Sequence, residues 1–125
     1  MKKTIGFGLI LMLFGALPVW AKPTRIVFKK GATKAVVTGK LRGYKSSAEY
    51  VIRLRAGQTF KVGSDKSITL TILDPSGEDV MDRDLGCNGR AEIAPTVAGD
   101  YRILVVECRK ADPWRGTFKL AVSVK

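Results

Sequence analysis

Apolar and polar residues alternate with a period of two along most of the chain beyond residue 22. The alternation is clearest in Ala48–Arg55, Ser67–Leu73 and Thr117–Val124, where every second side chain is apolar. This pattern predicts strands with one buried face and one face in water. Tyr101–Cys108 is apolar on both faces, which is typical of a central strand. No window combines the 3.6-residue period with the capping residues of an amphipathic helix.

Turn-forming residues separate these runs at regular intervals, as in Asp74–Gly77 and Ala98–Asp100. Glycine, proline, asparagine and aspartate supply backbone angles that strands do not adopt. About eight short strands at this spacing predict an all-β domain, either an antiparallel β-sandwich or a small barrel. The shorter predicted strands are Arg25–Phe28, Ala35–Leu41, Thr59–Val62 and Arg90–Ile93.

The first 21 residues have a different character. Met1–Lys3 is positively charged, Ile5–Leu17 is uncharged and apolar, and Pro18–Ala21 follows with small or branched residues. These are the three regions of a secretory signal peptide, with cleavage expected after Ala21. The apolar run is too short to span a bilayer comfortably. We therefore expect residues 22–125 to form one exported, periplasmic domain that is not inserted in the membrane.

The chain has two cysteines, Cys87 and Cys108, and no histidine. Because both cysteines lie in the part expected to be exported, the simplest inference is that they form one disulfide bond. Closing a loop of this length stabilises the fold by about 3 kcal/mol in the chain-entropy description. Two distant cysteines without histidine lack the spacing of a zinc site. We expect neither a metal nor another cofactor.

The chain has 22 basic and 11 acidic residues, a net charge of +11 at pH 7, which falls to +9 when Lys2 and Lys3 leave with the signal peptide. Such a charge favours anionic partners: envelope polymers, anionic lipid, nucleic acid or an acidic cleft in another protein. Nucleic acid is disfavoured, because the chain is expected to be exported and has no recognition-helix pattern. A basic surface with no specific partner is the alternative.

The residues also argue against an enzyme. Histidine, the commonest general base, is absent, and no serine sits in a nucleophile-elbow motif. The spacing of the acidic cluster does not match a calcium-binding loop, so we interpret it as a solvated turn region. The cluster consists of Asp74, Glu78, Asp79, Asp82 and Asp84.

The segment Arg109–Gly116 joins the last two predicted strands and has the composition of a binding loop. It contains Arg109, Lys110, Trp114 and Arg115. Arginine and tryptophan are enriched among the residues that anchor protein interfaces. In the alternative interpretation, Trp114 covers the end of the core and the arginines are solvated.

Several short motifs resemble the periplasmic inhibitors of g-type lysozyme and their i-type inhibitor relatives, over Ile26–Val124. The more specific ones are the Lys-Gly opening, the Gly-Tyr loop and the arginine-bearing final loop. Two turns, Ala-Gly-Gln and Ala-Gly-Asp-Tyr, also occur in exported pre-peptidase C-terminal-like β-sandwich modules. The motifs lie in Ile26–Gly31, Gly39–Tyr44, Ala56–Gln58, Ala98–Ile103, Arg109–Ala111 and Arg115–Leu120.

The resemblance implies a β-sandwich that inhibits lysozyme, g-type favoured, by occluding the glycan-binding cleft and so protecting peptidoglycan. It implicates Tyr44 and Arg109 as contacts. Arg115 matches the second arginine of the family pattern Arg-x-x-Ala-Arg only if the loop is shifted in register, because Asp112–Trp114 interrupts the pattern here. The cysteines are a further departure from the family. The alternative function is a non-catalytic envelope-binding module that attaches to anionic glycan or lipid through its basic surface.

Overall fold

Eight strands form the fold in a computed structural model that describes residues 23–81, 87, 89–108 and 115–125. Every predicted strand is present, and no boundary differs from the predicted one by more than three residues. The signal peptide expected at residues 1–21 lies outside the described residues. The strands are β1 (Thr24–Arg25), β2 (Lys34–Arg42), β3 (Ser47–Leu54), β4 (Phe60–Ser64), β5 (Ile68–Leu73), β6 (Arg90–Ile93), β7 (Gly99–Glu107) and β8 (Arg115–Val124).

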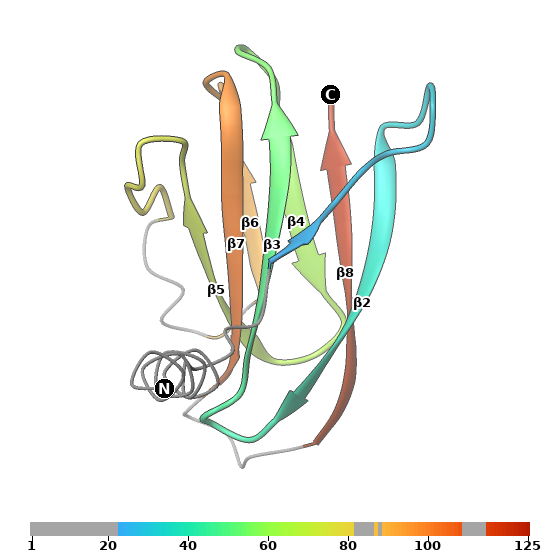
Figure 1. The fold of residues 1–125 in the computed structure, drawn as a ribbon, viewed down its shortest axis with the longest axis vertical. Coiled ribbons are helices and arrows are strands. Elements are labelled where there is room, and N and C mark those ends of the chain that lie inside the picture. Colours follow the sequence, from blue (N-terminus) through green and yellow to red (C-terminus); the bar gives the residue numbers. More distant parts are fainter. Residues whose placement is uncertain (1–22, 82–86, 88, 109–114) are drawn as a thin grey trace, which may run out of the picture.

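The strands form two sheets of four, with the orders β1-β3-β7-β5 and β2-β8-β4-β6, which face each other as a sandwich (Figure 1). The predicted all-β sandwich is therefore confirmed. All neighbouring strands are antiparallel except β1 and β3, which run parallel. Strand β7 lies inside its sheet, between β3 and β5, as its apolar sequence predicts. Among the described residues no helix is long and apolar enough to cross a bilayer.

The core lies between the sheets and consists of every second side chain along the strands, the ones that point toward the facing sheet. Tyr50 of β3 reaches across to Phe118 of β8, and the two rings meet edge to face with their centroids 6.5 Å apart. Gly39 makes room for this contact, because a Cβ atom there would lie 2.3 Å from Phe118 and 2.4 Å from the Tyr50 hydroxyl. Burial raises the pKa of Tyr50. The period-two pattern thus identifies the residues that hold the two sheets together.

Strand direction places the connections at two opposite ends of the sandwich. The β2–β3 turn, the end of β7 and the start of β8 share one end (Figure 1), which we call the Tyr44 end. The β3–β4 and β6–β7 connections share the other end, which we call the Thr96 end.

Thr96 ties the second end together with neutral hydrogen bonds. Its side chain is buried, donates to the Arg55 carbonyl at 2.6 Å and accepts from the Gln58 N–H at 3.0 Å. Its backbone groups also bond to the β3–β4 turn, where Gly57 donates to the Thr96 carbonyl at 2.8 Å. Buried polar groups are costly unless paired. This network therefore gives the Thr96 end a fixed shape.

Candidate functional site

The Gly43–Ser46 turn between β2 and β3 presents Tyr44 at the surface of the Tyr44 end. Gly43 has a φ of 89°, a backbone angle that favours glycine, and its carbonyl accepts the Ser46 N–H at 3.0 Å. The side chain of Tyr44 is 37% exposed. The local sequence therefore forms a tight turn that carries one aromatic ring at its tip.

Glu107, the last residue of β7, braces this turn from inside the sandwich. Its carboxylate accepts the Gly43 N–H at 2.5 Å, although the side chain is only 1% exposed. A buried carboxylate is very costly unless charge-assisted hydrogen bonds stabilise it. The contact therefore fixes the position of the turn relative to the end of β7. Sequence reasoning overlooked Glu107, but its inward position in the alternation of β7 was the signal for it.

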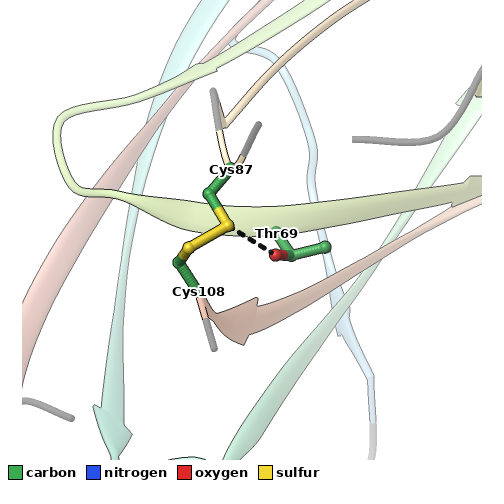
Figure 2. The surroundings of a disulfide bond; sticks show 3 residues. All are labelled: Thr69, Cys87 and Cys108. Atoms are coloured by element: carbon green, nitrogen blue, oxygen red, sulfur yellow. Dashed lines mark hydrogen bonds between the residues drawn. A yellow bond between two sulfur atoms is a disulfide. The ribbon is translucent and has the colours of Figure 1, made fainter. Parts of the chain in front are cut away.

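A disulfide bond cross-links the same end. Cys108, directly after Glu107, is bonded to Cys87 with a Cα–Cα distance of 5.5 Å, so the predicted disulfide is confirmed. Figure 2 shows the disulfide beside β5, where the Thr69 hydroxyl lies 3.5 Å from the Cys87 sulfur. Two consecutive residues, Glu107 through a hydrogen bond and Cys108 through a covalent bond, thus anchor the point at which the 109–114 segment begins.

Two arginines face each other where β2 ends and β8 begins. Arg42 and Arg115 are directly opposite in the antiparallel register, and both are exposed. Like charges in this arrangement destabilise a sheet unless an anion offsets them. With their strand neighbours they line a hollow of about 270 Å³. Arg42 flanks the Gly-Tyr motif in sequence, but only the strand register reveals that it lies opposite Arg115.

The described candidate residues converge. Tyr44 and Arg115 lie at one end, since Tyr44 is two residues beyond Arg42, the partner of Arg115. Arg109, Lys110 and Trp114 lie outside the described residues, but the flanking Cys108 and Arg115 both belong to the Tyr44 end. The shared end agrees with a single loop-based binding surface.

The described part of the acidic cluster lies elsewhere, in the turn that follows β5. The Asp74 carboxylate accepts hydrogen bonds from the backbone and hydroxyl of Ser76, at 2.9 and 2.6 Å, and from the Glu78 N–H at 3.0 Å. The Ser76 hydroxyl and neighbouring backbone N–H groups hold the pKa of Asp74 below its usual range. Asp82 and Asp84 lie outside the described residues. Within the described part of the chain, no three potential metal ligands come together.

These features define a β-sandwich that presents a tyrosine and two arginines at one end. The chain is similar to the crystal structure of PliG from Aeromonas hydrophila, a periplasmic lysozyme inhibitor of g-type lysozyme. The identity is 25%, the match covers 82% of this chain and 96% of that one, and the TM-score is 0.67. PliG from Salmonella Typhimurium, of the same description, is 20% identical over 85% of this chain and 100% of that one, with a TM-score of 0.65.

The pre-peptidase C-terminal domain of a Bacillus anthracis collagenase shares the fold at 19% identity. That match covers 87% of this chain and 100% of that one, with a TM-score of 0.55. Neither a protein-family model nor a curated protein matches the chain. The structures that share this fold thus include both groups that the sequence motifs resemble, which confirms the resemblance.

Proposed function

We propose that this chain is an exported, non-catalytic inhibitor of lysozyme, with g-type lysozyme as the favoured target and the periplasm as its location. One observation carries the proposal. The Gly43–Tyr44 turn, Arg115 and both flanks of the 109–114 segment converge at one end of a fold shared with periplasmic lysozyme inhibitors.

Inhibition requires only occupation of the lysozyme cleft. Lysozymes are glycosidases with an essential carboxylic acid beside the scissile bond. A guanidinium from Arg109 or Arg115 would make charge-assisted, bidentate hydrogen bonds to that acid. Tyr44 would stack where a sugar ring of the substrate binds, and Lys110 and Trp114 would extend the contact. The inhibition is therefore competitive and changes no covalent bond.

A braced loop lowers the entropic cost of this binding. Side chains and loops that become ordered in a complex reduce its affinity, whereas positions fixed beforehand do not. Glu107 fixes the Gly43 backbone, and the disulfide fixes Cys108. Both restraints act at the roots of the proposed contact residues and leave the Tyr44 ring exposed at the surface.

The test is a cell-wall lysis assay with g-, i- and c-type lysozymes. We expect inhibition, strongest for the g-type enzyme. Tyr44→Ala, Arg109→Ala and Arg115→Ala should each weaken it at least tenfold, because central interface residues contribute about 2 kcal/mol or more.

Arg55→Ala is the matched control, because Arg55 is an exposed arginine at the Thr96 end. It removes one positive charge far from the proposed contact, so it should leave inhibition unchanged. No inhibition of any of the three lysozymes at micromolar protein would contradict the proposed function. Normal inhibition by all three contact variants would contradict the site.

A further inference from the structure

The outward face of the β2-β8-β4-β6 sheet carries most of its charge as cations. The register assigns the residues that point outward, and they form five successive cross-strand rows. Each row contains at least one lysine or arginine. From the Thr96 end to the Tyr44 end, the cations are Lys34 with Lys61, then Arg90, then Lys119, then Lys40, and finally Arg42 with Arg115. We call these seven residues the cationic track.

The spacing of the track follows from strand geometry. Alternate residues of a strand lie about 6.7 Å apart, so four steps between five rows extend roughly 27 Å. The cations are therefore distributed along the length of the sheet, over its four strands, and do not cluster around one point. Charges distributed in this way match a linear polyanion, whereas a small anion would need its ligands to converge.

Anionic groups neutralise little of this track. Among the described residues, the one ion pair on this face joins Lys61 to Glu92 at 3.3 Å, with both side chains about 60% exposed. Asp65 lies at the rim, where its carboxylate accepts the Lys119 backbone N–H at 2.8 Å. Arg42 and Arg115 stand opposite each other in the last row, which raises the energy of the unliganded sheet.

The outward face of the other sheet is closer to charge balance. Arg25 bonds to Asp100 through both guanidinium nitrogens, at 3.2 and 3.0 Å. Arg53 pairs with Asp100 in the strand register, and Arg102 also acts on its charge. The three arginines of that face therefore share it with the carboxylates of Asp100 and Glu49. The excess positive charge of the described strands is a property of one sheet.

The first two rows of the track, at the Thr96 end, surround a hollow that is floored by small residues. Ala121 and Gly63 are register partners, and the hollow above them measures about 370 Å³. A polymer chain could lie there close to the backbone, flanked by Lys34, Lys61 and Arg90.

We propose that the cationic track binds a linear anionic polysaccharide, which lies along β2 and β8 across the Ala121–Gly63 hollow. The described outward face has no aromatic side chain on which nucleobases could stack. Its one large, exposed apolar side chain is Val36, so it offers little to insert into a bilayer. This binding would hold the inhibitor at a glycan surface. The track meets the proposed lysozyme contact in its last row, where Arg115 belongs to both, and its other four rows lie toward the Thr96 end.

The probe is polygalacturonate, a linear polyuronate, with uncharged dextran as its neutral counterpart and phosphatidylglycerol vesicles as the lipid arm. The test variant combines Lys34→Gln, Arg90→Gln and Lys119→Gln, all remote from Tyr44. The control variant combines Arg53→Gln, Arg55→Gln and Arg102→Gln, which removes the same charge elsewhere. Binding is measured by titration calorimetry at low and at moderate salt.

We expect binding to polygalacturonate that weakens with salt, at least a tenfold loss in the track variant, and less than a threefold loss in the control variant. Inhibition of lysozyme should stay within twofold of the unmodified protein in both variants, which separates this proposal from the proposed function. Equal losses in the two variants, preferential binding to vesicles, or no binding to polygalacturonate would each overturn it.

Discussion

The two ends of the sandwich are held in different ways. At the Thr96 end, one buried hydroxyl links two connections through neutral hydrogen bonds. At the Tyr44 end, a buried carboxylate and a disulfide restrain two consecutive residues, Glu107 and Cys108. At the Tyr44 end, two exposed arginines, Arg42 and Arg115, also stand opposite each other.

This difference indicates that the Thr96 end is complete in the free protein, whereas the Tyr44 end is suited to bind a partner. A neutral network that satisfies its own groups needs no partner, and the Thr96 end has one. A like-charged pair is unfavourable in the free protein and becomes favourable only when an anion binds. The stronger restraints at the Tyr44 end hold such a pair, together with a presented aromatic ring, in a fixed geometry.

Removal of the disulfide should give the largest effect. The double variant Cys87→Ser, Cys108→Ser opens a loop between residues 21 positions apart. In the chain-entropy description this lowers the free energy of unfolding by about 3 kcal/mol. Urea unfolding of the oxidised protein and of the variant measures the loss. A loss below 1 kcal/mol would show that the cross-link contributes little to the Tyr44 end.

Thr96→Val should give the next largest effect and should act on the opposite end. It leaves the Gln58 N–H and the Arg55 carbonyl without their partner, which costs about 2 kcal/mol. Thr96→Ser keeps the hydroxyl and is the matched control. Inhibition by the folded fraction should be unchanged in both. A loss of inhibition beyond the loss of folded protein would contradict the separation of the two ends.

The fold could be predicted because burial on one face of a strand makes apolar and polar residues alternate along its sequence. The pairing of the strands could not be predicted, because it depends on contacts between segments distant in the chain. The parallel β1–β3 pair and the Arg42–Arg115 pair are both of this kind. The disulfide was predictable because only one pairing exists. Tyr44 and Arg115 were identified from motifs, and the structure adds the register partner Arg42 and the brace from Glu107.

Glu107→Gln tests whether the brace at the Tyr44 end depends on charge. A glutamine still offers an oxygen to the Gly43 N–H, but a neutral hydrogen bond is weaker than a charge-assisted one. We expect a loss of about 1 kcal/mol in stability and a measurable weakening of inhibition. Glu49→Gln, on the outward side of β3, is the control and should change neither. Unaltered inhibition by Glu107→Gln would show that the turn is held without the charge.

Acid should act mainly on the Thr96 end and should give the smallest effect. Asp100 is the second residue of β7 and lies at that end, and the hydrogen bond of its carboxylate to Arg25 holds its pKa below the usual 3.8. A carboxyl whose pKa is lowered by folding stabilises the fold fully above its unfolded pKa and loses that contribution as pH falls through the folded value. The contribution of Asp100 is therefore present at pH 5 to 7 and declines below about pH 4.

Asp100→Asn removes this titration, so urea unfolding should show a smaller stability difference between pH 5 and pH 3 in the variant than in the unmodified protein. Asp74 has a lowered pKa for a different reason, its hydrogen bonds within the turn, and lies at the same end, because it follows Leu73, the last residue of β5 and the register partner of Arg102. Asp74→Asn should reduce the acid sensitivity in the same direction. An identical pH dependence in all three proteins would mean that acid acts on carboxylates elsewhere in the fold and not mainly at the Thr96 end.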